Sequence, residues 1–195
     1  LRQSLLATGK FRVRLTRDRD VFIRLRDRIA IARRAGADLF ISVHADSIGN
    51  SRVRGTSVYT LSERASDKEA GALARKENKS DLIAGVDLDD QSNDVVNILI
   101  DLAQRETMNE SAVFARKLVD ELGKTRKLLR NTHRFAGFAV LKAPDIPSVL
   151  VELGYLSNRS DEKMLRNPRQ RKRMAAAMSA AVKRYFERQQ ALNRP

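Results

Sequence analysis

The 195-residue chain contains no cysteine and only two histidines, His44 and His133. Without thiols, disulfide bonds and cysteine-ligated zinc or iron–sulfur sites are excluded, so any metal site must use histidine, aspartate or glutamate. No apolar run approaches the roughly 20 residues that span a bilayer, so we expect no transmembrane segment. The start, from Leu1 to Ser4, has no signal-peptide pattern, and we interpret the chain as a processed or excised piece that could have lost one.

Aromatic residues are scarce, at 5% of the chain, and tryptophan is absent. Because single-stranded nucleic acid is bound by stacking on aromatic rings, this lack argues against a nucleic-acid-binding module despite the net charge of +14. Residues 1–34 and 159–195 each carry 11 basic and 3 acidic side chains, whereas the residues between them carry 16 and 18. Two basic ends suit an anionic polymer or a membrane surface, although solvated helix faces give the same count.

The hydropathy pattern predicts a β-α-β unit near the start of the chain. Residues 11–16 alternate apolar and basic side chains, with the period of a strand that buries one face. Apolar residues then recur at helical spacing from Val21 to Ala32, and Gly36 marks the end of this amphipathic helix. Residues 38–44 are mostly apolar β-formers, typical of a strand buried in a parallel sheet. We therefore expect an α/β fold with a mixed, mainly parallel sheet flanked by helices.

The middle of the chain differs in character. Residues 67–110 are polar, helix-permissive and locally acidic, which indicates a helical insertion within a single domain. Inside it, an apolar face at residues 95–102 predicts at least one short helix. Outside it, the patterns predict strands over 55–60, 138–141 and 148–152, and helices over about 110–122 and 168–190.

Two of the predicted strands end in side chains suited to catalysis. His44 closes one strand and Glu152 closes another. Because ligands of open α/β sheets bind beyond the carboxyl ends of the strands, neighbouring parallel strands would bring both side chains into one crevice. Imidazole is a good zinc ligand, and a carboxylate beside a metal-bound water can act as a general base. On spacing alone, a structural histidine and a turn-capping glutamate remain alternatives.

Three stretches carry a more specific signal. Residues 15–28 (LTRDRDVFIRLRDR), 37–46 (ADLFISVHAD) and 141–158 (LKAPDIPSVLVELGYLSN) closely resemble, in the same order, the zinc-dependent N-acetylmuramoyl-L-alanine amidases of bacterial cell-wall turnover. The resemblance covers essentially the whole chain. It implies a Zn²⁺ hydrolase that acts on peptidoglycan and cuts the amide between N-acetylmuramic acid and the L-alanine of the stem peptide.

The resemblance also implies roles for particular residues. His44 matches the family's second histidine ligand, and Glu152 matches its catalytic glutamate, in a Val-Glu-x-Gly motif. In that scheme zinc polarises the scissile carbonyl and lowers the pKa of its water toward ~7, while Glu152 passes the proton to the leaving amine. Asp46 and Asn158 are expected to position their neighbours at most, and His133 to be a surface or packing histidine.

The family's pattern begins with a strand that ends in a His-Gly-Gly ligand motif, followed by a glutamate ligand, and neither is present here. We therefore interpret residues 1–195 as an amidase catalytic domain that lacks its N-terminal strand and first metal ligands, with further ligands expected upstream of Leu1. Because zinc sites normally use at least three protein ligands, the chain as written is expected to bind zinc poorly and to be inactive.

The insertion 67–110 has a counterpart in the division-associated Gram-negative branch of the family. Residues 74–86 (ARKENKSDLIAGV) resemble its helix over the active site, from which a glutamate occupies the open position on the zinc. Glu77 is the first candidate for this inhibitory ligand, followed by Glu69 and Glu106, and a plain solvated helix is the alternative. Activator proteins with LytM-type domains displace the helix in that branch, so such an activator is an expected partner.

Taken together, the composition and the family resemblance imply an autoinhibited peptidoglycan amidase of the periplasm, monomeric, with its signal segment absent from this chain. One alternative is a catalytically inactive relative that binds cell wall or a partner protein. A basic nucleic-acid-binding module is the other, but it has only the charge in its favour, so we expect no nucleic-acid partner.

Overall fold

The computed structural model describes residues 1–83 and 97–192, and its centre is a mixed sheet of four strands in the order β1-β4-β2-β3. β1 and β4 are parallel, as are β2 and β3, whereas β2 and β4 are antiparallel. The strands are β1 (Phe40–His44), β2 (Thr56–Leu61), β3 (Leu128–Ala136) and β4 (Ser148–Glu152). The predicted strands at 38–44, 55–60 and 148–152 are thereby confirmed.

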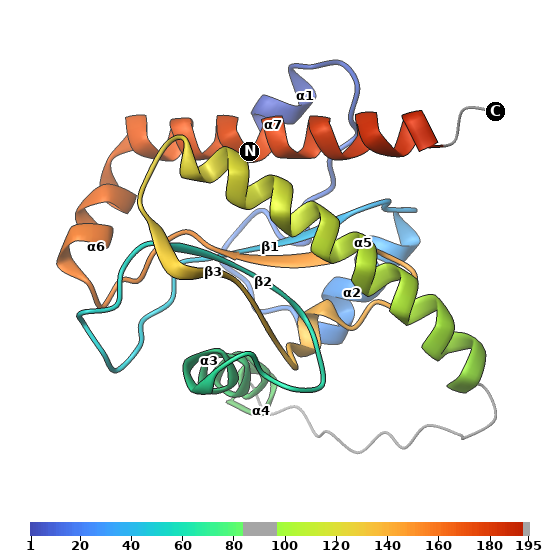
Figure 1. Cartoon of the computed structure of the whole chain (residues 1–195), viewed down its shortest axis with the longest axis horizontal. Coiled ribbons are helices and arrows are strands. Elements are labelled where there is room, and N and C mark those ends of the chain that lie inside the picture. The colour runs from blue at the N-terminus through green and yellow to red at the C-terminus, as the bar shows by residue number, and fades with distance from the viewer. Residues whose placement is uncertain (84–96, 193–195) are drawn as a thin grey trace.

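Helices cover both faces of the sheet, with α5 and α7 on one side and α2, α3 and α4 on the other (Figure 1). This arrangement confirms the predicted α/β fold. The helices are α1 (Arg2–Leu6), α2 (Leu25–Arg34), α3 (Lys68–Asn78), α4 (Ser80–Ile83), α5 (Asn97–Gly123), α6 (Arg159–Arg166) and α7 (Pro168–Leu192), with a 3₁₀ turn η1 (Ala139–Leu141).

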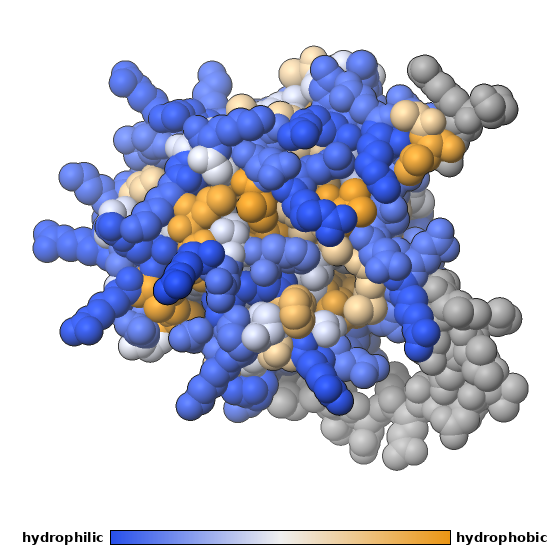
Figure 2. Space-filling view, viewed as in Figure 1, coloured by the Kyte–Doolittle hydropathy of each residue, from blue (hydrophilic) through white to orange (hydrophobic). Residues whose placement is uncertain are grey.

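The two faces of the sheet bury separate hydrophobic clusters. Val149 and Val151 of β4 pack with α5 and α7, whereas Leu150 between them packs with α2, α3 and η1. Successive strand residues point to opposite faces, so a strand covered on both sides is apolar at every such position. The visible surface is mostly hydrophilic, with apolar residues in small areas between long polar side chains (Figure 2).

The strand predicted at residues 11–16 is wrong, because this segment is not part of the sheet. Alternate side chains of this segment are nevertheless directed inward. Phe11 and Val13 pack on the cluster under α7, and the ring centroids of Phe11 and Phe186 lie 5.5 Å apart. A groove of about 1030 Å³, lined by residues 10–17 and by β1, separates the segment from the edge of the sheet. A period-two pattern fixes which side chains are buried, but a strand also needs a neighbour that supplies hydrogen bonds.

The strand predicted at 138–141 is also wrong, since these residues form η1, where the Leu141 N–H donates to the Phe138 carbonyl. Their side chains are apolar because the turn is buried under α2 and α3. The fourth strand is β3 instead, and the sequence did not reveal it because polar residues fill its middle.

Three helix predictions differ in extent from the two helices observed, α2 and α5. α2 begins at Leu25 rather than Val21, because its first N–H is capped by the carboxylate of Asp81. The helix predicted at about 110–122 is the last part of the longer α5, and it ends at Gly123 as expected. The start of the short helix predicted at 95–102 lies outside the described residues, and from Asn97 onward that stretch belongs to α5.

Candidate metal centre and active site

The sheet places His44 and Glu152 side by side. β1 and β4 are parallel neighbours in register, and His44 pairs with Glu152 at the last position of both strands. The Leu153 N–H donates a hydrogen bond to the His44 carbonyl at 2.9 Å, so the two segments remain paired just beyond the ends of β1 and β4. The imidazole and the carboxylate therefore lie at the same edge of the sheet, where α/β proteins bind ligands.

Glu152 is fully buried, and its two carboxylate oxygens have different surroundings. Oε1 accepts a hydrogen bond of 2.8 Å from the Asp46 N–H, whereas Oε2 has no partner among the described residues. Burial raises the pKa of Glu152 from 4.5 to about 8, although the hydrogen bond from Asp46 opposes the rise. A carboxyl group with this pKa can take up and release a proton near neutral pH, as a general base must.

A second cluster of ligating groups lies around the imidazole of His44. One atom each from His44, Asp46 and Glu77 lie within 4.8 Å of one another. Asp46 Oδ2 is 3.4 Å from His44 Nδ1, and Glu77 Oε1 is 3.8 Å from His44 Nε2. Two ligands about 2.1 Å from one tetrahedral zinc lie about 3.4 Å apart, so the separation of Nε2 and Oε1 fits a shared ion.

Cations near this cluster offset part of its negative charge. Lys76 Nζ donates to the Ser47 carbonyl at 2.7 Å and lies 3.6 Å from Asp46 Oδ1. Burial alone would raise the pKa of Asp46, but the hydrogen bond to His44 and the nearby ammonium of Lys76 hold it below its usual value. Arg28 of α2 lies 3.8 Å from Glu77, which therefore contacts both the guanidinium and the imidazole.

The other two glutamates considered for the inhibitory role lie elsewhere. Glu69 is two thirds exposed and pairs with Arg134 at 3.0 Å. Glu106 is exposed on α5, which covers the opposite face of the sheet from α3. Of the three candidates, Glu77 is the one that contacts His44 within the described part of the chain.

The remaining polar residues singled out from the sequence have structural contacts. His133 Nε2 lies 3.1 Å from the Thr60 hydroxyl on the outer strand pair, away from the edge that carries His44. Asn158 caps α6, and its carboxamide oxygen accepts the N–H groups of Ser160 and Asp161. We therefore assign neither His133 nor Asn158 as a metal ligand.

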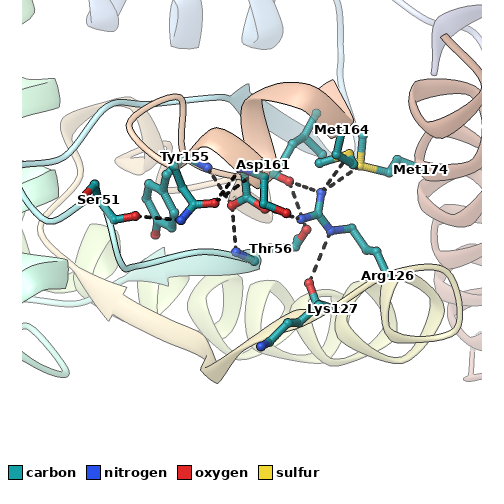
Figure 3. A network of polar contacts seen from close by, with 12 residues as sticks. Ser51, Thr56, Arg126, Lys127, Tyr155, Asp161, Met164 and Met174 are labelled. Carbon is teal, nitrogen blue, oxygen red and sulfur yellow. Dashed lines mark hydrogen bonds and ion pairs between the residues drawn. The ribbon is translucent and has the colours of Figure 1, made fainter. Parts of the chain in front are cut away.

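A buried network around Asp161, which no sequence pattern indicated, holds the loop after β4 (Figure 3). Asp161 Oδ2 accepts the Gly55 N–H at 2.8 Å and the Tyr155 N–H at 3.1 Å, and Oδ1 pairs with Arg126 at 3.3 Å. Gly154 has φ +151°, and a Cβ there would lie 3.0 Å from the Asp161 carboxylate. The contact from Gly55 joins residues 106 positions apart and the pair with Arg126 joins residues 35 positions apart, so no local sequence signal could have revealed these two.

Comparison with known proteins identifies the family. The sequence pattern of the N-acetylmuramoyl-L-alanine amidases (Amidase_3) matches residues 1–184. The chain belongs to this family. The family inferred from the motifs around His44 and Glu152 is therefore confirmed.

Individual relatives agree with this placement. N-acetylmuramoyl-L-alanine amidase AmiC from Escherichia coli O6:H1 is 40% identical over 95% of this chain and 45% of that protein. AmiA from Escherichia coli K12 is 39% identical over 94% of this chain and 64% of that protein. This chain thus spans between 45% and 64% of the length of these two relatives.

The fold is that of solved amidases. The structure of Ami1 from Mycobacterium smegmatis aligns over 95% of this chain and 71% of that chain, with a TM-score of 0.66 and 20% identity. The catalytic domain of CwlV from Bacillus (Paenibacillus) polymyxa gives a TM-score of 0.60 at 24% identity, over 95% of this chain and 78% of that chain. Within the described residues, no helix is both long and apolar enough to cross a membrane.

Proposed function

We propose that this protein is a zinc-dependent peptidoglycan hydrolase that cleaves the amide between N-acetylmuramic acid and the L-alanine of the stem peptide. The observation that carries the proposal is the pairing of His44 and Glu152 at the ends of adjacent parallel strands. Family membership supplies the class of substrate, and the buried carboxylate beside an imidazole supplies the chemistry.

The side chains at this edge fit a zinc ion. His44 and Glu77 would hold it, because the Nε2 and Oε1 atoms lie at a separation that one ion can bridge. Asp46 faces the other ring nitrogen, Nδ1, where a carboxylate orients a ligating histidine. Bound zinc would supply Lewis acidity toward the scissile carbonyl and the attacking water.

Glu152 would move the proton. Its Oε1 is held by the Asp46 N–H, which leaves Oε2 as the basic atom. Oε2 would accept the proton of the attacking water and return it to the nitrogen of the leaving L-alanine.

A complete site needs more ligands than His44 and one inhibitory glutamate. β1 is an outer strand of the described sheet, and a groove of about 1030 Å³ lies beside it. We infer that a strand preceding Leu1 pairs with β1 there and brings the first histidine and glutamate ligands. The domain would then comprise that strand and residues 1–195.

Glu77 would act as an inhibitory ligand. With zinc bound, the Glu77 carboxylate would compete with the attacking water for the metal, so α3 in its present place would keep the enzyme inactive. The contact between Glu77 and His44 supports this role for residues 67–110, the latter part of which includes residues outside the described ranges.

We infer the location and the partner of the enzyme from its family and its charge. Relatives from Gram-negative bacteria and the strongly basic ends of the chain support a periplasmic enzyme that acts on an anionic wall polymer. A LytM-domain activator that displaces α3 is the partner we expect.

Glu152→Gln and Glu77→Gln test the mechanism in the full-length protein, with hydrolysis of purified sacculi and bound zinc as readouts. Glu152→Gln should abolish turnover and leave one zinc per chain, because the amide cannot take a proton. Glu77→Gln should raise basal hydrolysis, because water regains its position.

Hydrolysis that survives Glu152→Gln at the wild-type rate would refute the assignment of the base. If the full-length protein carries zinc but cleaves no sacculi, either as wild type or as Glu77→Gln, the inactive, wall-binding relative would be favoured. Lys79→Ala, an exposed change on the same segment, is the matched control for Glu77 and should leave both readouts unchanged.

A further inference from the structure

The face of α3 that packs on the protein is unusually poor in apolar area. Its buried residues are Ala70, Gly71, Leu73 and Ala74. Leu73 is the one large side chain among them, whereas α5 and α7 each bury several. Since hydrophobic stabilisation scales with buried apolar area, α3 is held less firmly by packing than these two helices are.

Polar contacts at the beginning of α3 compensate for part of the apolar packing that this helix lacks. Arg134 of β3 is 5% exposed, and its guanidinium pairs with the carboxylate of Asp67, with Nε donating to Oδ2 at 2.8 Å. Its Nη2 also donates to Asp67 Oδ1 and, at 3.0 Å, to Glu69. Asp67 is the N-cap of α3 and accepts the Ala70 N–H at 2.9 Å, so the bidentate pair fixes the first turn of the helix to the sheet.

A second polar contact fixes the other end. Asn78, the last residue of α3, donates from Nδ2 to the Gly137 carbonyl and accepts the Ala139 N–H at Oδ1, both at 2.8 Å. One carboxamide thus satisfies two backbone groups in the turn between β3 and η1. Glu77, which contacts His44, is the residue immediately before this anchor.

The contacts at both ends of α3 are made with one short segment of the chain. Arg134, Gly137 and Ala139 lie within six residues at the end of β3, although they hold opposite ends of α3. Beyond α3, the carboxylate of Asp81 accepts the Leu25 N–H at 3.0 Å and ties the chain to α2. The unit held by the two anchors is therefore residues 67–79.

We propose that Arg134 and Asn78 are positioning residues that hold α3 as a detachable unit, and through it hold Glu77 against His44. The proposal rests on the inhibitory role proposed for Glu77. Because the anchors are polar, water or a partner can replace their hydrogen bonds when α3 leaves, and Leu73 is the one large apolar side chain of α3 that becomes exposed.

The test is hydrogen exchange of the wild-type chain, Asn78→Ala and Asp67→Asn. Asparagine at position 67 keeps the N-cap and loses the charge that pairs with Arg134, so folding is preserved. Asn78→Ala removes two hydrogen bonds, each of which contributes a factor of about 2 to 10. We expect exchange in residues 68–78 to rise about tenfold in Asn78→Ala, with residues 105–123 of α5 unchanged.

Lys79→Ala and Arg130→Ala are the matched controls, because both side chains are exposed. Lys79 follows Asn78 in the chain, and Arg130 lies on β3 with Arg134. Neither should alter exchange in α3. Unchanged exchange in both anchor variants would overturn the proposal, as would a rise that extends equally to α5, since the residues would then stabilise the whole domain and not one unit.

A spectroscopic readout separates this proposal from the one on which it rests. In the full-length protein loaded with Co²⁺, departure of the Glu77 carboxylate should change the visible absorption spectrum of the metal. Asn78→Ala is expected to reproduce the spectrum of Glu77→Gln. If Glu77→Gln alters the spectrum and Asn78→Ala does not, the anchors do not position Glu77. If Glu77→Gln leaves it unchanged, the inhibitory role fails while the exchange data still decide the anchors.

Discussion

Replacement of the buried Glu152 by glutamine should make the stability of the metal-free chain less dependent on pH. Glu152 has a pKa of about 8 in the folded protein against 4.5 ordinarily, because burial disfavours its charged form. Between these values the folded state binds the proton more tightly than the unfolded chain does. Stability therefore falls as pH rises from about 4.5 to about 8.

The size of the effect follows from the same two values. A carboxyl group with these two pKa values loses roughly 4 kcal/mol of its contribution to folding across that window. Glutamine carries no such loss, but its amide places an N–H donor where Oε2 has no partner among the described residues, at a cost of about 1–2 kcal/mol. We expect Glu152→Gln to be about 1 kcal/mol less stable than wild type at pH 5 and about 2–3 kcal/mol more stable at pH 8.5.

Urea unfolding of both proteins with a metal chelator, at pH 5 and pH 8.5, measures this difference. Other titrating groups are common to the two proteins and cancel. Glu162→Gln, which replaces a partly exposed carboxylate of α6, is the control, and its difference from wild type should stay constant. A Glu152→Gln difference that is the same at both pH values would refute the argument that burial governs this carboxyl group.

Further consequences concern two buried ion pairs. Burial alone would raise the pKa of Asp67, but the hydrogen bonds from the Arg134 guanidinium lower this pKa to about 2. The stabilisation from this pair is therefore present above pH 4 and is lost as the pH falls toward 2. Unfolding of Asp67→Asn and wild type should differ by about 1 kcal/mol at pH 6, and this difference should vanish near pH 2. Asp161→Asn should lower the unfolding free energy by about 3 kcal/mol, because it leaves the buried Arg126 unpaired, whereas Glu162→Gln, in an exposed pair, should cost under about 1 kcal/mol.

The central part of the site could be predicted from the sequence because it depends on strand geometry. Two apolar strands that end in His44 and Glu152 must present these side chains at one edge if they are parallel neighbours, and they are. The resemblance of residues 74–86 to the inhibitory helix of related amidases predicts Glu77, but its contact with His44 depends on where the fold places α3. Local pattern thus supplied the strand ends, while the position of the helix required the fold.

The errors have a common physical cause. The alternation at residues 11–16 correctly marks Phe11 and Val13 as buried, but no pattern within a segment shows whether another strand lies beside it. β3 was missed for the converse reason, since it pairs with β2 although polar residues fill its middle. Backbone pairing depends on the neighbour, and hydropathy reports only burial.

The protonation of Glu152 and the charge of the cluster beside it are aspects of one electrostatic balance. Asp46, Glu77 and Glu152 bring three carboxylates to one edge of the sheet, and the cations beside them are Lys76 and Arg28. Without a metal ion, the buried group keeps its proton, which removes one negative charge from a site of low polarity. A divalent cation in the cluster would favour the carboxylate instead, so metal binding and the creation of the base would be a single event. In the proposed inhibited state, the Glu77 carboxylate of α3 would add a further negative ligand to the metal, and a partner that binds α3 more tightly would be needed to remove it.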